Sequence, residues 1–104
     1  MASSRRFLEF VLDQLSALNG ISYKAMMGEY IIVYRGKIVG GIYDDRFLVK
    51  KTSAALRLMP DAPSELPYPG AKEMILVEDV DNREFMSELV DAVAAELPEP
   101  KRRG

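Results

Sequence analysis

The chain has 104 residues, of which 48% are hydrophobic and 29% are charged, and its formal net charge is −2. This length allows one domain, and the mixed composition is that of a globular chain rather than a disordered or membrane-spanning one. The sequence contains no Cys and no His, which excludes disulfides, thiolate chemistry, zinc sites built from these residues and imidazole-based triads. The small negative charge offers no general attraction for a nucleic acid.

An amphipathic helix is predicted near the N-terminus. Ser3 or Ser4 can cap its start, and Asn19-Gly20 is a typical end. The apolar residues recur at helical spacing, at Phe7, Leu8, Val11, Leu12, Leu15 and Leu18. No apolar run of a signal peptide precedes them, and no stretch approaches the ~20 residues of a membrane span. We therefore expect a cytoplasmic protein that does not enter a membrane.

Residues 29–51 alternate with period two and predict three antiparallel strands. Two-residue loops at Arg35-Gly36 and Asp44-Asp45 would place Tyr34 opposite Lys37 and Tyr43 opposite Arg46. An unbroken register then assigns to the core face Ile31, Val33, Ile38, Gly40, Ile42, Phe47 and Val49. It assigns to the reverse face Tyr30, Ile32, Tyr34, Lys37, Val39, Gly41, Tyr43, Arg46, Leu48 and Lys50.

The rest of the chain predicts a second helix, one or two strands and a final helix. Thr52 or Ser53 caps the second helix, which Pro60 ends. An irregular stretch over 61–70 with a short strand near 66–68 is followed by a strand over 72–78. Asp81 and Glu84 resemble a capping box for the last helix, which ends before Pro98. The order predicts an α+β fold of two layers, an antiparallel sheet with helices on one face.

A family resemblance rests on the segment YKAMMGEY at 23–30 and on the hairpins that follow it. The chain resembles the N-terminal domain of the TfoX/Sxy proteins, whose signature is a Met-Phe-Gly-Gly segment, a Tyr-containing strand, a Gly turn, and a strand ending in Asp before a Leu-Tyr-Leu-Lys strand. The positions that fall on this signature are Met26, Met27, Gly28, Tyr30, Gly36, Asp44, Leu48 and Lys50. The sequence departs from it at Glu29, where the family often has a second glycine, and at Met27, where it often has Phe.

The resemblance implies one TfoX N-terminal-like domain over residues 1–98, with a frayed basic tail over 99–104. It also implies the fold of the secretion-chaperone type, with the order helix, three strands, helix, two strands, helix. Longer members of the family regulate bacterial natural competence and carry a second domain, whereas isolated copies of the first domain have no assigned function. A regulatory role therefore follows from resemblance alone.

Several residue groups have both a functional and a structural interpretation. Lys24, Lys50, Lys51, Lys72 and Arg46 could form an anion site with tyrosine stacking, or a solvated sheet edge. The acidic pairs at Asp44-Asp45, Glu78-Asp79 and Asp79 to Asp81 could bind a metal or act as acid and base, or form turns and caps. Met26-Met27-Gly28 could contact a ligand, or form a turn with one Met in the core. Lys50 could be a desolvated nucleophile, or lie along the sheet.

The sequence predicts a non-enzymatic interaction module without cofactor or metal, which binds a protein partner or itself as a homodimer. We expect the interface on the reverse face of the sheet, with a centre at Ile32 and Val39. Its candidate residues are Tyr30, Ile32, Tyr34, Val39, Tyr43 and Leu48. One alternative is a regulator that binds nucleic acid weakly. The other is a small-molecule binder or enzyme that uses Lys and Tyr residues, in a pocket between the Met26-Met27-Gly28 turn and the proline-containing stretch over 61–70.

Overall fold

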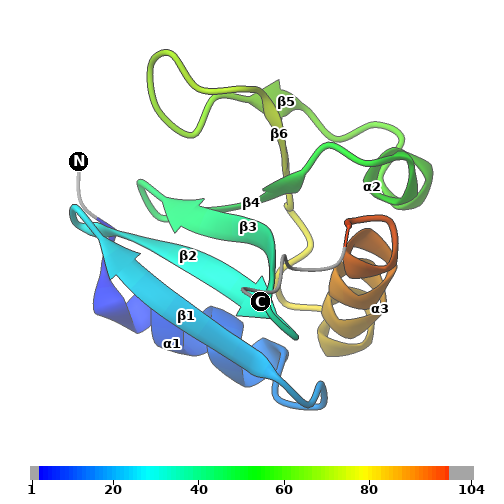
Figure 1. Cartoon of the computed structure of the whole chain (residues 1–104), viewed down its shortest axis with the longest axis horizontal. Helices are drawn as coiled ribbons and strands as arrows, with labels where there is room; N and C mark the ends of the chain where they lie inside the picture. The colour runs from blue at the N-terminus through cyan, green and yellow to red at the C-terminus, as the bar shows by residue number, and fades with distance from the viewer. Residues whose placement is uncertain (1–2, 99–104) are drawn as a thin grey trace, which may run out of the picture.

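The fold is seen in a computed structural model, which describes residues 3–98. Within them the order is α1 (Arg5–Gln14), β1 (Ile21–Met26), β2 (Glu29–Tyr34), β3 (Lys37–Tyr43), β4 (Arg46–Lys50), α2 (Ser53–Leu58), β5 (Ser64–Glu65), β6 (Met74–Leu76) and α3 (Arg83–Ala95). The six strands form one sheet in the order β1-β2-β3-β4-β6-β5, and every neighbouring pair is antiparallel. The helices pack on one face of this sheet (Figure 1). The predicted α+β fold is confirmed. The predicted tail at 99–104 lies outside the described residues.

Helix α1 begins where the sequence predicts and ends earlier. The Ser4 hydroxyl accepts a hydrogen bond from the Phe7 N–H at 3.1 Å and caps the helix. The helix ends at Gln14, because the next residues form tight turns in which the Leu18 N–H donates to the Leu15 carbonyl at 3.0 Å. Gly20 has a φ of 99° and stands at the turn into β1 rather than at the end of the helix.

Strand β1 was not predicted, although Ile21, Tyr23 and Ala25 alternate with Ser22, Lys24 and Met26 along it. It pairs with β2 through a two-residue turn at Met27-Gly28, whose φ values are 51° and 87°. The turns at Arg35-Gly36 and Asp44-Asp45 also have positive φ at both residues. Such turns match the right-handed twist of paired strands. The hairpin loops that the sequence predicts at 35–36 and 44–45 are confirmed, as are the pairs Tyr34 with Lys37 and Tyr43 with Arg46.

A β-bulge in β3 changes the register within the β2–β3 hairpin. Val33 lies opposite Ile38, but the next residue, Ile32, lies opposite Gly40. Val39 is therefore the extra residue on β3. Gly40 permits the arrangement, because a Cβ built on it would lie 2.1 Å from the carbonyl oxygen of Leu48 on β4. A glycine inside a strand is a known signal of a bulge or of close backbone approach, and here it marks both.

The bulge makes part of the predicted face assignment wrong. A shift of one residue turns every side chain beyond it to the other face. Ile32, Tyr34 and Val39 consequently lie in the core, at 0%, 3% and 0% exposure, although the unbroken register assigns them to the reverse face. Conversely, Ile38 is 45% exposed. On β3 and β4 the assignment holds beyond the bulge, where Ile42, Phe47 and Val49 face the helices. On β2 it is reversed: Ile31 and Val33, assigned to the core face, lie on the outer face, and Tyr30, opposite Ile42, packs against the core.

The C-terminal half follows the prediction with three corrections. The short strand is Ser64–Glu65 rather than 66–68, where Pro67 has no N–H to donate. The predicted strand over 72–78 is limited to Met74–Leu76. Helix α3 is capped by Asn82, whose side chain accepts from the Phe85 N–H at 3.0 Å, and not by Asp81. The predicted cap of α2 at Thr52 is confirmed.

One hydrophobic core lies between the sheet and the three helices. Leu8 and Val11 come from α1, Leu15 directly follows it, and Met86, Leu89, Val90 and Val93 come from α3. Against them pack the inward side chains of the strands, Ile32, Tyr34, Val39, Ile42, Phe47, Val49 and Ile75. Among residues 3–98, no helix is long and apolar enough to cross a membrane.

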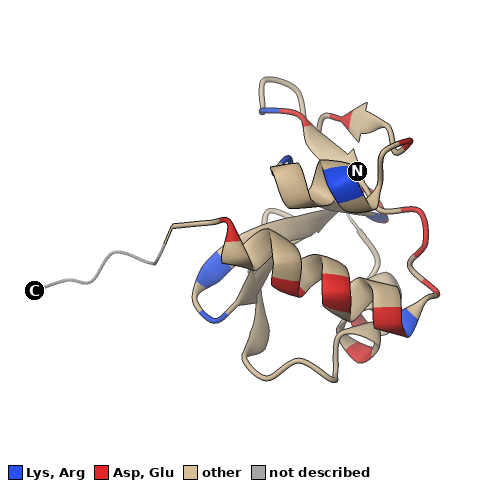
Figure 2. Ribbon diagram, turned by 90° about the vertical axis from the view of Figure 1, so that its right-hand side faces the viewer, with Lys and Arg blue, Asp and Glu red and all other residues tan. Residues whose placement is uncertain are grey.

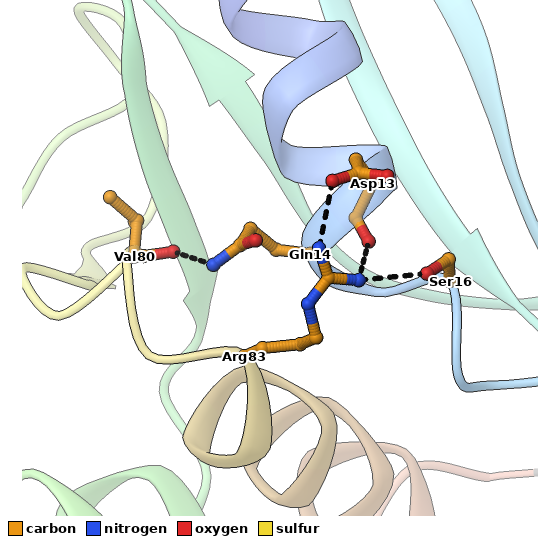
Figure 3. A network of polar contacts seen from close by, with 5 residues as sticks. All are labelled: Asp13, Gln14, Ser16, Val80 and Arg83. Carbon is orange, nitrogen blue, oxygen red and sulfur yellow. Dashed lines mark hydrogen bonds and ion pairs between the residues drawn. The ribbon is translucent and has the colours of Figure 1, made fainter.

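Polar contacts join the end of α1 to the start of α3 (Figure 3). The Gln14 side chain is only 6% exposed and donates to the Val80 carbonyl at 2.9 Å. Arg83 donates to the Asp13 carbonyl at 2.8 Å and to the Asp13 carboxylate at 2.9 Å, with both side chains more than half exposed. The two helices are held at a defined spacing by one buried and one exposed contact.

The first prediction tests the bulge with a matched pair of substitutions. Ile32→Asp places a charge in the core and should lower the free energy of unfolding by more than about 4 kcal/mol, a large part of the roughly 5 to 15 kcal/mol that is typical of a domain. Ile38→Asp adds the same charge at an exposed site of the same hairpin and should leave the helical circular dichroism intact. Urea unfolding measures both variants, and an Ile32→Asp variant as stable as Ile38→Asp would contradict the observed register.

The second prediction concerns the contact between the helices. Gln14→Met keeps the length of the side chain but removes its donor, so the Val80 carbonyl loses its partner. The free energy of unfolding should fall by about 1 to 2 kcal/mol. Arg83→Met removes an exposed ion pair and should cost less, about 0 to 1 kcal/mol. Urea unfolding of both variants measures the difference, and an equal loss would contradict it.

Candidate functional site

The outer face of the sheet, opposite the helices, is divided into two parts. Over β4, β6 and the end of β3 the face is covered, and we call this part the covered half. Over β1, β2 and the start of β3 it is open, and we call this part the open half. The division explains why Leu48 points outward yet is fully buried, whereas Ile38 on the same face is exposed.

The covered half is closed by the proline-rich loop between β5 and β6, residues 66–73, which lies at the top of the molecule in Figure 1. Within it, Pro67 is buried and the Tyr68 ring lies 6.1 Å from the Tyr43 ring. Arg46 anchors the base of the loop, because its guanidinium contacts the Glu65 carboxylate at 2.6 Å and the Leu66 carbonyl at 3.4 Å. The loop is therefore a packed part of the fold.

One cavity of about 450 Å³ lies between this loop and the residues at the β1–β2 and β3–β4 turns. We call it the glutamate cavity; it is lined by Glu29, Asp44, Arg46, Leu66, Pro67, Tyr68 and Pro69. Sequence reasoning expects a small-molecule site between the Met26-Met27-Gly28 turn and the proline-rich loop. The structure has a cavity at that place, although its walls come from the residues after the turn.

A polar network closes one end of the glutamate cavity. The Ser3 hydroxyl donates to Glu29, and the Asp44 N–H donates to the same carboxylate at 3.2 Å. The Asp45 N–H donates to the Ser3 hydroxyl at 3.0 Å, and the Asp45 carboxylate accepts from the Ser4 N–H at 2.7 Å. These bonds tie the start of α1 to two hairpin turns. Sequence reasoning missed the pairing of Ser3 with Glu29, which lies 26 positions along the chain and has no local signal.

Tyr43 lies beside this cavity and is only 7% exposed. Burial of its side chain, with smaller effects from Tyr68 and Glu29, raises the pKa of the phenol above its usual range. The neutral phenol is therefore favoured in the folded protein. The Tyr43 ring also fills the space beside Gly41, where a Cβ would lie only 2.7 Å from the ring.

A second cavity of about 630 Å³ lies on the other side of the proline-rich loop, and we call it the lysine cavity. Its lining residues are Lys50, Lys51, Thr52, Pro67, Tyr68, Gly70, Ala71, Lys72, Glu73, Met74 and Leu97. Three of the five cations in the predicted anion cluster meet here. The other two do not, since Lys24 lies on β1 and Arg46 pairs with Glu65.

The acidic pairs occupy turns, as their structural interpretation predicts. Asp44 and Asp45 both have positive φ and form the β3–β4 turn. Asp79 accepts from the Asn82 side chain at 3.4 Å, just before α3. In the described part of the chain, no three carboxylates converge in a group that could hold a metal ion.

The open half carries exposed and half-exposed aliphatic side chains. Val33 and Ile38 lie directly opposite one another, and Ile31 is two residues from Val33 on the same face. Met26 lies diagonally from Ile31 across the β1–β2 pair. Met26 and Ile38 are 40% and 45% exposed. These four residues are neighbours on the outer face, bordered there by Ser22, Lys24 and Glu29, and we call them the apolar patch.

The predicted interface residues do not form an exposed surface. Ile32, Tyr34 and Val39 are in the core, Tyr43 and Leu48 are buried under the proline-rich loop, and Tyr30 is half-buried against Tyr23. The centre at Ile32 and Val39 is therefore wrong, because the bulge turns that stretch of sheet inward. The exposed aliphatic residues are their neighbours in sequence.

The residues of the family signature do not meet in one site. Met26 lies in the apolar patch, and Tyr30 packs against the core. Met27, Gly28, Gly36 and Asp44 form the hairpin turns, and Met27 is 98% exposed. Neither methionine of the Met26-Met27-Gly28 segment is in the core, so the expectation of one buried Met is wrong. Leu48 is buried on the covered half, and Lys50 lines the lysine cavity.

Charge is distributed unevenly over the molecule. Figure 2 shows acidic residues along the solvent side of α3, where Glu84, Glu88 and Asp91 are exposed at helical spacing. The lysines of the lysine cavity lie elsewhere, at the end of β4 and in the proline-rich loop. An anion would therefore be repelled by the solvent side of α3 and attracted to that cavity.

Comparison with known proteins gives one relative of similar length. The chain is 34% identical, over 104 aligned positions, to an uncharacterised 12.7 kDa protein in the trpE 5′ region of Spirochaeta aurantia, and the match covers 99% of this chain and 90% of the relative. The chain belongs to the family of this protein. No family model matches the sequence, and no solved structure matches it.

The third prediction uses the raised pKa of Tyr43. Because folding raises the pKa of this phenol, the neutral phenol stabilises the folded protein at pH values below its unfolded pKa of about 10. This stabilisation is lost as the pH rises through the pKa that the phenol has in the folded protein. Stability should therefore fall with pH above about 10, and Tyr43→Phe should reduce the slope of that fall. Urea unfolding from pH 9 to 11 measures both proteins, and equal slopes would contradict the assignment.

Proposed function

We propose that this protein is a non-enzymatic protein-interaction module of the cytoplasm, with a regulatory role, and that the apolar patch is its docking surface. The observation that carries the proposal is the exposure of Met26, Ile31, Val33 and Ile38 as neighbours on one side of the sheet. Contiguous apolar surface of this kind is a mark of protein contact sites.

The edge of the sheet supports the same interpretation. Strand β1 is an outer strand, so one side of its backbone has no neighbouring strand. Natural proteins commonly protect such an edge with charged side chains, especially lysine, with proline or with a bulge. Strand β1 has a single charge, Lys24, and pairs regularly with β2 without a bulge. A partner strand placed beside β1 would continue the sheet and bring its own side chains against the apolar patch. A second copy of the chain can supply that strand.

The surroundings of the catalytic candidates favour binding over catalysis. A nucleophilic lysine is activated by desolvation, but Lys50 is exposed. Asp44 and Asp45 have structural roles in the β3–β4 turn and in the network with Ser3. The resemblance to the TfoX/Sxy N-terminal domain supports a regulatory role, because longer members of that family are regulators.

The fourth prediction tests the apolar patch with two equally exposed residues. Ile38 and Leu56 are 45% and 46% exposed, and Leu56 lies on α2, away from the patch. Ile38→Asp should weaken association by at least about tenfold, since a charge would have to be desolvated at the contact, whereas Leu56→Asp should have no effect. Sedimentation velocity over a concentration series measures self-association.

A second measurement tests whether the apolar patch binds a different protein rather than a second copy of this chain. Quantitative affinity capture from a lysate of the native host would compare the wild type, Ile38→Asp and Leu56→Asp as baits. A protein retained by the wild type and Leu56→Asp but lost with Ile38→Asp supports the proposal. A wild type that stays monomeric and captures the same proteins as Ile38→Asp contradicts it.

A further inference from the structure

The lysine cavity has the dimensions of a ligand site and lies outside the apolar patch. Its volume of about 630 Å³ is within the range of about 300 to 1,000 Å³ that is common for small-molecule sites. The walls come from the end of β4, the start of α2 and the proline-rich loop. It is therefore built by segments that are distant in sequence.

The charge of this cavity is positive on a molecule whose net charge is negative. Three lysines and one glutamate line it, and the chain as a whole has a formal charge of −2. Lys51 is paired with Glu73 at 3.4 Å. Within residues 3–98, the side chains of Lys50 and Lys72 make no hydrogen bond or ion pair. Two cations without a counter-charge therefore border the same cavity, where they can bind an anionic group.

The backbone fixes Lys50 at the end of a paired strand and places Lys72 just after a turn of the loop. Lys50 is the last residue of β4 and lies opposite Met74 of β6, while its carbonyl accepts from the Thr52 N–H at 2.9 Å. Lys72 follows Gly70, whose φ of 88° turns the loop and where a Cβ would meet nothing within 4 Å. The loop backbone beside Lys72 is therefore open to close approach by a ligand.

The same cavity offers an aromatic and apolar wall. Tyr68 contacts the Tyr43 ring and remains 53% exposed, so part of its ring is available to a ligand. Pro67, Met74 and Leu97 add apolar surface. A flat ring would pack against such a wall, in the way that bases stack on aromatic side chains.

We propose that the lysine cavity binds a small phosphorylated ligand with a flat ring, of the nucleotide type. Lys50 and Lys72 bind the phosphate oxygens, and the ring packs on Tyr68. This site does not depend on the proposed protein-interaction role, because none of its residues belongs to the apolar patch.

The fifth prediction uses ADP as the probe, with pyrophosphate and adenosine as its two parts, in isothermal titration at low salt. Lys50→Gln and Lys72→Gln should each weaken binding of ADP and of pyrophosphate by about three- to fivefold, the range expected for one exposed charge contact. Binding of adenosine should not change. Tyr68→Leu should weaken ADP and adenosine but not pyrophosphate. Lys24→Gln is the matched control, because Lys24 is an exposed lysine on β1, away from the cavity.

Three results would overturn the proposal. One is the absence of ADP binding at about 10 mM, far above the concentration at which such a site should fill. Another is an equal loss for Lys24→Gln and Lys50→Gln, which would indicate attraction to surface charge in general. The third is binding of an eight-residue oligothymidylate at least about tenfold tighter than ADP with a steep salt dependence, which would assign the cavity to single-stranded nucleic acid. The substituted side chains are exposed, so circular dichroism should remain that of the wild type.

Discussion

The extra residue in β3 is the constraint on which the architecture of this protein depends. Because Val39 is inserted between Ile38 and Gly40, the hairpin of β2 and β3 turns Ile32, Tyr34 and Val39 toward the helices. Without it, these large side chains would face outward. The exposed aliphatic residues of the open half are the other consequence of the same insertion.

A second constraint acts on the opposite end of the sheet. The three helices cover one face only, so the outer face needs another cover wherever its side chains are large and apolar. The proline-rich loop supplies this cover above Leu48 and Tyr43, and the contact of Arg46 with Glu65 holds its base. This loop also forms a wall of both cavities of the outer face, because Pro67 and Tyr68 line the glutamate cavity and the lysine cavity alike.

The two proposed surfaces differ in the physical effect they use. The apolar patch would bind by removing aliphatic surface from water, which favours a polypeptide partner of matching shape. The lysine cavity would bind by charge and ring packing, which favours a small anion. They occupy different halves of the outer face, so that a module of this size can hold a ligand and a partner at the same time.

Sequence alone determined the features that depend on neighbours along the chain. The turns at 35–36 and 44–45 and the apolar stripes of α1 and α3 are local, because backbone conformation and helical spacing set them. The caps of α1 and α2 were each narrowed to two neighbouring residues, of which the structure has Ser4 and Thr52. Residues close in sequence could therefore be assigned to elements, and the α+β class followed from their order.

Only the tertiary structure decided which side chains are exposed. The bulge at Val39 requires close approach between Gly40 and the Leu48 carbonyl, and the Gly-Gly pair was the one local sign of it. The edge strand β1 is formed by pairing with β2, and the cover over Leu48 comes from a loop about 20 residues away. Lys50 and Lys72 meet for the same reason. Contacts between distant segments are set by packing, which no pattern of neighbouring residues encodes.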